Sequence, residues 1–452
     1  MLVLSTEILS RLQFAFTISF HAIFPTLNIG LAVFLVYWEY QYLKTDSKFY
    51  LKLCQFWMKI FALSFGMGVV SGVVLAYELG ANFSGLIAYA GNILGPLMLL
   101  ETMTAFFLEA GFLGIMLFGW NRVGKRAHFL STCMVSMGTV ISLLWIMSAN
   151  SFMQTPVGYK VFNNTLIIAD SWIPVIFNPS FILRALHMLI ATLLTTSFFV
   201  MGVSGYFFFK NKDVLFAKAS FTPALYVALL LSILQVFSGD RVGLMVYKYQ
   251  PIKTAAIEAN WQTKNSAPLI LFAIPDIKNR VNHFEISIPK LGSWINTRDL
   301  NGVLPGLESV KQEDLPPVAA VFYSFRVMVG IGLWFIFLAS WGMYCKRRHQ
   351  LVRQKLFLYA IMLSTPLGFV ATIAGWMTSE MGRQPWVIYK IMRTKDSISN
   401  LPAEQVLTSL TIIFILYLFF FYSYLRFVRK VICEGFDKKS KVLLSSIGDS
   451  DD

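Results

Sequence analysis

Two histidines and one methionine lie within apolar stretches, where polar side chains are costly. His21 stands about two turns into the first stretch and His187 about two turns into the fifth. Met328 lies in the seventh stretch, in the segment FYSFRVMVGIG. Because His and Met are an axial pair of electron-transfer haem, His187 and Met328 predict such a site. A hydrogen-bonded structural histidine and a packing methionine are the simpler alternatives.

Acidic side chains form a second set of candidates. Glu101 and Glu109 lie eight residues apart in the third stretch, within about 80° of the same helical face at 3.6 residues per turn. Such a pair can relay protons, or one acid can bind a metal while the other relays protons, or both can be structural. Ser142 in the fourth stretch is a further relay candidate, and Glu380 closes the eighth.

One arginine has a position that suits a negatively charged ligand. Arg184 stands three residues before His187, so it lies on the same helical face and one turn nearer the predicted outer surface. This is where a haem propionate would need a cation.

The composition explains why polar residues in these stretches are exceptional. Of the 452 residues, 56% are hydrophobic and 14% are charged, whereas a soluble domain carries about 25% charged residues. The apolar residues extend along the whole chain, which excludes a disordered chain, a coiled coil and a secreted disulfide scaffold. The net charge of +14 lies in short loops, which is typical of topogenic charge and not of nucleic-acid binding.

The apolar stretches predict the elements that carry the candidates. A helix needs about 20 mostly apolar residues to cross a bilayer, because its backbone must be hydrogen-bonded within the segment. Nine stretches qualify, so we expect an all-α polytopic membrane protein. They lie near 14–42, 54–79, 92–120, 128–150, 181–210, 221–237, 318–344, 356–376 and 406–427.

Lysine and arginine set the expected orientation of these helices. They gather in alternate connections, beginning with Lys44, Lys48 and Lys52. Because positively charged loops stay in the cytoplasm, the N-terminus is predicted outside and the C-terminus in the cytoplasm. The candidate haem ligands would then lie in the outer half of the bundle.

The same pattern divides the chain into four parts. Residues 1–237 carry transmembrane helices one to six, and 238–316 form a long polar loop outside. Residues 317–428 carry helices seven to nine, and 429–452 form a cytoplasmic tail. A connection as long as 238–316 is usually functional when it is not disordered.

Three motifs resemble subunit I of cytochrome bd quinol oxidase, a family that includes a cyanide-insensitive branch. GWMTSEMGRQPWVIY (375–389) resembles the GWxxxExGRQPW signature of that family, and YQPIKTAAIEANWQT (249–263) is similar to its quinol-loop motif. SFRVMVG around Met328 is a third match. The resemblance extends from the opening SRLQFAFTISFH to the ninth span, and it implies the same orientation with the shorter form of the quinol loop.

The resemblance implies three haems. His187 and Met328 match the ligands of a low-spin haem b, with Arg326 nearby; Arg326 leaves the helix on a different face from Met328, so we expect it to tune charge and not to bind iron. His21 and Glu380 match the single ligands of two high-spin haems. One is a haem b and the other is haem d, a chlorin, or a further haem b. Which residue holds which haem stays open.

Further residues match roles around these haems. Glu101 matches an acid beside the oxygen-reducing haem, Glu109 and Ser142 match a proton path from the cytoplasm, and Trp376 matches an aromatic side chain between the haems.

Two loop residues, Lys253 and Glu258, match quinol-binding residues. In that role the carboxylate would accept a hydroxyl proton and the cation would steady the developing charge. An ordinary exposed helical charge pair is the alternative.

The resemblance implies the haem subunit of a terminal oxidase in the bacterial cytoplasmic (inner) membrane. Such an electrogenic quinol:oxygen oxidoreductase oxidises ubiquinol or menaquinol outside and reduces dioxygen to water with cytoplasmic protons. It generates proton motive force without pumping. The implied partners are a second membrane subunit, small single-helix subunits and the lipid bilayer, and no nucleic acid. Two alternatives are an electron-transfer b-type cytochrome without oxygen chemistry and, less favoured, a secondary transporter, which would show broken helices and inverted repeats.

Overall fold

A computed structural model describes residues 5–308 and 310–436 of the chain. Within these residues, nine helical segments are long and apolar enough to cross a membrane. The predicted polytopic helical fold with nine spans is therefore confirmed. The part of the predicted tail at 437–452 lies outside the described residues.

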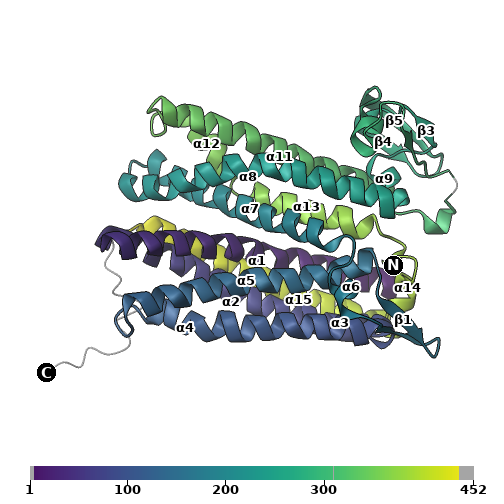
Figure 1. Cartoon of the computed structure of the whole chain (residues 1–452), viewed down its shortest axis with the longest axis horizontal. Helices are drawn as coiled ribbons and strands as arrows, with labels where there is room; N and C mark the ends of the chain where they lie inside the picture. Colours follow the sequence, from purple (N-terminus) through teal and green to yellow (C-terminus); the bar gives the residue numbers. More distant parts are fainter. Residues whose placement is uncertain (1–4, 309, 437–452) are drawn as a thin grey trace.

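Long helices lie side by side and form most of the molecule (Figure 1). The third span contains a π-helical segment and the eighth is divided in two. The spanning elements are α1 (Thr6–Thr45), α2 (Lys48–Asn82), α3 (Ser84–Thr104), the π-helix η1 (Ala105–Ala110), α4 (Gly111–Phe118), α5 (Lys125–Gln154), α7 (Phe181–Phe209), α8 (Val214–Tyr249), α11 (Val318–Arg347), α12 (Lys355–Ser364), α13 (Leu367–Met381) and α15 (Ala403–Glu434).

Most of these helices are longer than the apolar stretches that predict them. The clearest difference is α8, which was expected to end near Phe237 and continues to Tyr249. The polar residues after Phe237 are still helical, and Asp240 on this extension forms an ion pair with Arg298 of the loop. The hydropathy pattern marks only the most apolar part of a helix, so it misses a continuation of mixed polarity.

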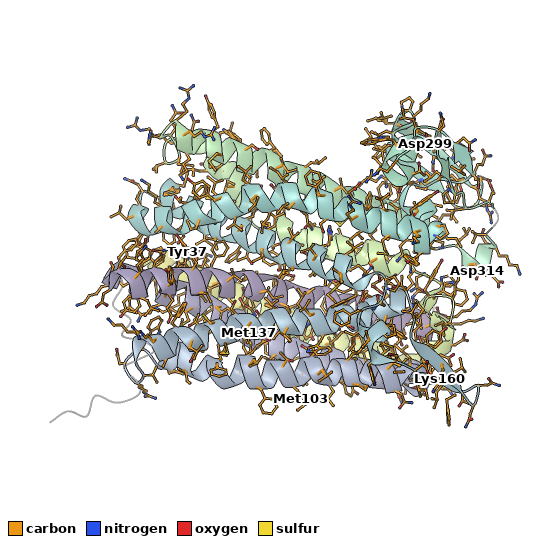
Figure 2. The ribbon with its side chains drawn as sticks, in the orientation of Figure 1. Tyr37, Met103, Met137, Lys160, Asp299 and Asp314 are labelled. Atoms are coloured by element: carbon orange, nitrogen blue, oxygen red, sulfur yellow. The ribbon has the colours of Figure 1, made fainter. Side chains whose placement is uncertain are left out.

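The connections with secondary structure of their own gather at one end of the bundle, which we call the loop end (Figure 1). Figure 2 shows Lys160, Asp299 and Asp314 at this end. The elements are β1 (Tyr159–Phe162), β2 (Leu166–Ala169), α6 (Trp172–Ile176), α9 (Pro251–Ile257), β3 (Lys264–Asn265), β4 (Leu269–Asp276), β5 (Val281–Ile288), α10 (Leu291–Thr297), β6 (Val303–Leu304), the 3₁₀ turn η2 (Gln312–Asp314), β7 (Trp386–Ile388), β8 (Met392–Arg393) and α14 (Thr394–Ser397).

All the strand pairs at the loop end are short and antiparallel. β4 pairs with β5, and the residues before and after this hairpin are joined by the pair β3 and β6. The long loop is therefore a folded unit and not an extended linker.

Helix α7 lies at the centre of the bundle and packs against α1, α5, α8, α12 and α13. Its contact with α11 includes Phe198 and Phe335, whose rings are stacked 3.7 Å apart between centroids. Stacked aromatic side chains stabilise a fold by more than the burial of their apolar area alone. Because α7 is held on several sides, any side chain that it directs into the bundle has a well-defined position.

Candidate functional site

His187 and Met328 each lie against a glycine of a neighbouring helix. A Cβ added to Gly239 of α8 would lie 3.3 Å from Cε1 of His187 on α7. A Cβ added to Gly375 of α13 would lie 3.0 Å from the sulfur of Met328 on α11. Both glycines therefore leave room that any other residue would fill.

The ring nitrogens of His187 have different surroundings. Nε2 lies 3.2 Å from the side-chain nitrogen of Gln235 on α8. Nδ1 is buried and has no hydrogen-bond partner. A buried imidazole with an unpartnered nitrogen costs free energy unless another group binds it. This observation fits an axial ligand, since an iron ion would take one ring nitrogen while the other stays oriented by the protein.

His21 on α1 also has one ring nitrogen held by a neighbouring helix. Its Nδ1 lies 2.9 Å from the hydroxyl of Ser71 on α2, and that hydroxyl is itself 2.8 Å from the carbonyl oxygen of Met67. A Cβ added to Gly72 would lie 3.3 Å from Cε1 of the imidazole. Ser71 therefore orients the ring through one nitrogen, as second-shell groups do for haem-ligating histidines.

Glu380 lies near the end of α13 and is held from three directions. One carboxylate oxygen accepts hydrogen bonds from the side-chain amides of Asn150, at 2.9 Å, and Gln154, at 3.1 Å, both on α5. The other oxygen forms an ion pair with Arg383. The carboxylate is thus fixed by groups from two separate parts of the chain.

Arg184 is buried beside the same group. Its guanidinium donates to the side-chain oxygen of Asn150 and, at 3.0 Å, to the hydroxyl of Ser379. Its Nε is buried with no partner. The predicted cation near His187 is therefore inside the protein, with one donor still free for a negatively charged group.

Lys253 on α9 reaches into this cluster from the loop end. Its side chain is only 2% exposed, and Nζ lies 2.5 Å from Oε1 of Gln154. Burial lowers the pKa of Lys253 well below its usual range, and the positive charges of Arg184 and Arg383 lower it further. Burial likewise lowers the pKa of Arg383. Three buried basic side chains, two of them guanidinium groups, thus lie near the one carboxylate of Glu380.

This excess of positive charge bears on the fit of a haem. Buried charges are costly unless they are paired, and Glu380 can balance only one of Arg184, Arg383 and Lys253. A haem carries two propionate carboxylates, so it would supply the missing negative charge. Together with the unpartnered nitrogen of His187, this charge balance fits haem in the bundle.

Glu258 follows α9 and is 4% exposed. Its partner is not Lys253 but Arg326 of α11, with 3.0 Å between carboxylate oxygen and guanidinium nitrogen. The guanidinium also donates to the carbonyl oxygen of Ile270, at 2.7 Å, and lies 3.8 Å from the ring centroid of Phe322. The alternative of an ordinary exposed pair between Lys253 and Glu258 is therefore wrong, because both side chains are buried and each has a different partner.

The structure connects two of the three predicted relay residues directly. The hydroxyl of Ser142 on α5 donates to Glu101 of α3 at 3.3 Å. Glu109 lies in the π-helix η1 and is 7% exposed, and a Cβ added to Gly138 of α5 would lie 2.8 Å from its Cγ. Both acids therefore face α5, although the π-helix changes the angle expected for a regular α-helix.

Trp376 on α13 packs in an apolar cluster between α1, α5 and α7. The buried members of this cluster include Ile29, Leu143 and Phe181. The indole therefore lies among the helices that carry His21, Ser142 and His187.

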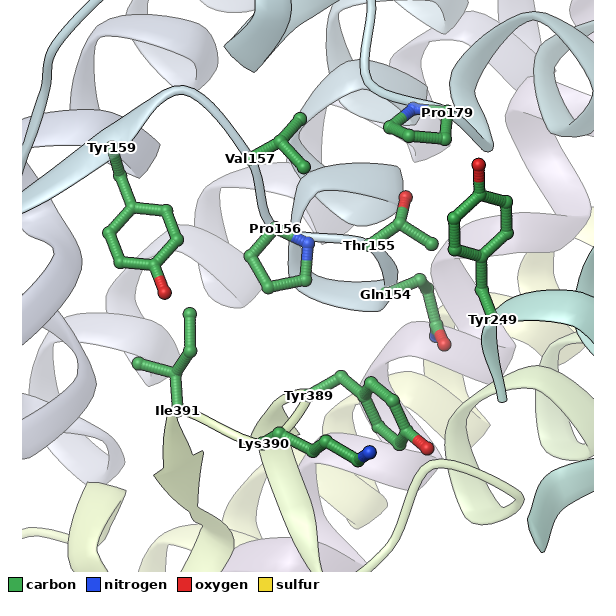
Figure 3. Close-up of a pocket in the computed structure, with 10 residues that line it drawn as sticks. All are labelled: Gln154, Thr155, Pro156, Val157, Tyr159, Pro179, Tyr249, Tyr389, Lys390 and Ile391. Carbon is green, nitrogen blue, oxygen red and sulfur yellow. The ribbon is translucent and has the colours of Figure 1, made fainter. Parts of the chain in front are cut away.

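A cavity of about 290 Å³ lies beside Gln154 at the loop end. Its walls come from the residues after α5, the end of α8 and the segment after β7, and they include Tyr159, Tyr249, Tyr389 and Lys390. Figure 3 shows the rings of Tyr249 and Tyr389 on either side of Gln154. Burial raises the pKa of Tyr389.

Several residues of the site were missed by sequence reasoning. Arg383 stands inside the GRQPW motif, so the motif could have indicated it. Gln154, Asn150 and Gln235 are neutral amides near or within helices, and nothing in a single sequence separates them from other polar residues. Gly72 and Gly239 stand inside continuous helices, where glycine is destabilising, but the sequence does not tell which side chains they face.

Buried acids in two other places were also missed. Glu78 on α2 accepts a hydrogen bond from Thr17 at 2.9 Å, and Glu39 on α1 lies 2.6 Å from Nδ1 of His128. Both acids stand in long helical stretches, so the same cost argument that selected Glu101 could have selected them.

Comparisons with known proteins identify the family of this chain. The family model of cytochrome bd terminal oxidase subunit I matches residues 9–436. The chain is 34% identical to "Cytochrome bd ubiquinol oxidase subunit 1" of Bacillus subtilis (strain 168), over 92% of this chain and 91% of the relative. It is 29% identical to "Cytochrome bd-II ubiquinol oxidase subunit 1" of Escherichia coli (strain K12), over 93% and 95%.

A solved structure is similar over nearly the same length. The bd oxidase from Geobacillus thermodenitrificans gives a TM-score of 0.88 at 26% identity, covering 95% of this chain and 99% of the matched chain. The motifs named from the sequence, the helical bundle and these matches point to the same family. The chain therefore belongs to the family of cytochrome bd terminal oxidase subunit I.

Proposed function

We propose that this chain is the haem-bearing subunit of an electrogenic quinol:oxygen oxidoreductase. It oxidises quinol at the loop end and reduces dioxygen to water with protons taken up from the opposite side. The observation that carries the proposal is the buried cluster in which Gln154 joins Lys253 of the quinol-loop motif to Glu380 of the GRQPW motif. This contact brings the substrate motif and the candidate haem ligand into one hydrogen-bonded unit.

The candidate ligands divide into one pair and two single residues. His187 and Met328 would hold a low-spin haem b, while His21 and Glu380 would each hold a high-spin haem, one b and the other d or b. When bound, these groups supply one-electron transfer and the activation of dioxygen. The three glycine contacts and the unpartnered Nδ1 of His187 support this assignment. Arg184 would face a propionate, and Trp376 would lie between the haems.

At the quinol site, the residues of this chain hold and move protons. The Glu258 carboxylate would accept a proton from a quinol hydroxyl, and its ion pair with Arg326 fixes its position at the loop end of α11. Lys253 would steady the negative charge that develops on the second oxygen. Burial of both side chains keeps water from screening these interactions.

Protons for water formation would pass along α5. Glu109 takes up the proton, Ser142 passes it on, and Glu101 delivers it near the oxygen-reducing site. The hydrogen bond from Ser142 to Glu101 supports the last step of this order. Because quinol protons leave at one side and substrate protons enter from the other, charge separates without a pump.

The charged loops of the chain indicate its orientation in the membrane, and its family indicates its partner subunits. The connections rich in lysine and arginine would face the cytoplasm, so the loop end would face outward from a bacterial inner membrane. The long loop would supply the quinol site; helix α8 ends at Tyr249, so the loop begins at Gln250. A subunit I implies a second membrane subunit, and small single-helix subunits would complete the complex.

Haem content and optical spectra test the proposal. The complex of this chain with its second subunit should contain three haems per subunit I and show b-haem bands, with a chlorin band if haem d is present. His187→Ala and Met328→Leu should each remove only the low-spin signal. Met103→Leu is the matched control, because Met103 is exposed on the third span and projects from the bundle (Figure 2). One haem would indicate an electron-transfer cytochrome, and none would indicate a transporter.

A further inference from the structure

We propose that the cavity beside Gln154 is the aqueous outlet through which the protons of quinol oxidation leave the protein. This inference rests on the proposed function, and it adds a route and a positioning residue to it. Quinol oxidation breaks two O–H bonds and yields quinone, two electrons and two protons. The electrons would reduce haem iron, whereas the protons need a separate path to water.

The quinol-site side chains themselves offer little path to solvent. Lys253 is 2% exposed and Glu258 is 4% exposed. A proton released beside them must therefore cross protein before it reaches water. Gln154 is a polar group on the cavity side, and its Oε1 lies 2.5 Å from Nζ of Lys253 and 3.1 Å from the side-chain nitrogen of Gln250.

Gln154 connects the quinol-site side chains to the cavity because it contacts both. It is 1% exposed, it holds Lys253, and it lines the cavity. Its amide nitrogen also donates to Glu380 and to the hydroxyl of Ser379. These bonds fix the amide, so Gln154 acts as a positioning residue that holds the amino group of Lys253 beside the wall of the cavity.

The cavity has the size and the polar groups that water requires. Its volume of about 290 Å³ exceeds what one ordered water needs, and water occupies a cavity when several polar partners are present. The phenols of Tyr159, Tyr249 and Tyr389 contribute to its walls (Figure 3). The hydroxyl of Tyr389 is buried with no hydrogen-bond partner, so a small shift of this ring would be needed for it to bind water in the cavity. The exposed side chain of Lys390 lies at the cavity and connects it to the surface.

A variant that fills the cavity without touching the quinol cluster tests the route. Val157 lines the cavity and is half-buried, so Val157→Trp should occupy the space that water would use. Ile173→Trp is the matched control, because Ile173 lies on nearby α6 and is 73% exposed. Both proteins should keep the wild-type haem spectrum. Steady-state quinol oxidation should slow several-fold in Val157→Trp alone, with a larger solvent isotope effect because proton exit becomes limiting.

Equal turnover and an equal isotope effect in Val157→Trp and Ile173→Trp would overturn the proposal. A slower rate without a larger isotope effect would also overturn it, because quinol access, and not proton exit, would then be impaired.

A second measurement does not depend on activity. In right-side-out vesicles, Val157→Cys should react with a membrane-impermeant thiol reagent, and prior Ile391→Trp substitution should slow that reaction, because Ile391 lines the same cavity. Cys433, at the opposite end of the bundle on α15, should not react under these conditions. Labelling of Val157→Cys only after the vesicles are opened would exclude an outlet on the outer side. If the wild-type complex did not oxidise quinol, the proposed function would be refuted. The labelling result would still show whether the cavity opens to the outer side.

Discussion

A Cβ added to Gly239 would lie 3.3 Å from Cε1 of His187. The same relationship joins Gly72 to His21, at 3.3 Å, and Gly375 to Met328, at 3.0 Å. In each case the glycine and the candidate ligand belong to different helices. Three of the four candidate haem ligands therefore have space beside them because the neighbouring helix carries a glycine, which has no side chain, at that position.

Gly239→Ala should disturb the low-spin haem, because its Cβ contact is tighter than ordinary van der Waals contact and the imidazole must move. We expect a shifted or weakened low-spin b band in the reduced spectrum. Gly243→Ala is the matched control: it lies one turn further along α8, and a Cβ there would meet nothing within 4 Å. Identical spectra for the two variants would show that the glycine does not serve the haem.

Arg326→Met should destabilise the loop end. The substitution leaves the Glu258 carboxylate buried without its cation. Breaking a buried ion pair lowers the free energy of unfolding by about 3–5 kcal/mol. Because Arg326 is partly exposed, we expect a loss near the lower figure. Thermal unfolding and proteolysis of the loop between Gln250 and Pro316 would measure the loss. The double variant Arg326→Met with Glu258→Gln should recover part of the lost stability. If the stability losses of the two single variants simply add in the double variant, the ion pair does not stabilise the loop end.

Lys253 should make stability depend on pH. Its pKa is lowered in the folded protein, so the folded state binds fewer protons than the unfolded state between that lowered value and about 10.4. The free energy of unfolding therefore rises with pH across this window. It is lowest at pH values where Lys253 is protonated in both the folded and the unfolded state. Lys253→Met should flatten the rise in thermal midpoint with pH, whereas substitution of the exposed Lys248 by Met should leave it unchanged.

Ser142→Ala should slow oxygen reduction by roughly tenfold, because it removes the hydroxyl that donates to Glu101. The haem spectrum should not change. Ser131→Ala is the control, since the Ser131 hydroxyl bonds only to the carbonyl oxygen of Ala127 in its own helix, at 3.0 Å. Oxygen consumption with excess quinol measures the effect. Equal rates in both variants would remove Ser142 from the proton path.

The spans were predictable because length and hydropathy are properties of local sequence. The helical continuation beyond Phe237 was not, because residues of mixed polarity can be helical or irregular with little difference in local pattern. The loop was expected to be functional because of its length, but the pairing of β3 with β6 depends on contacts between residues far apart in the chain.

The candidate site was predictable where residue type itself carries the chemistry. His187 stands out because histidine is rare in apolar helices, whereas Met328 is one of 19 methionines and was selected by its depth and by the motif around it. Gln154 does not stand out, since its importance comes from simultaneous contact with Lys253 and Glu380. The partner of Glu258 was also beyond the sequence, because Arg326 lies on a helix after the loop and only folding brings the two together.

The π-helix η1 has a consequence for insertions and deletions. A π-turn contains one residue more than an α-turn, so loss of any one residue between Ala105 and Ala110 would let the segment become α-helical with its hydrogen bonds intact. The chain would still span the membrane, and because the π-turn already absorbs the extra residue, the residues on either side of η1 would keep nearly the same relative orientation. Glu101, which lies before η1, would still face α5, whereas Glu109 lies inside the turn and would change its position. A one-residue deletion inside η1 would therefore leave most of the span unchanged and alter chiefly the side chains of the turn, whereas a deletion elsewhere in the span would rotate one part of the helix by about 100° relative to the other.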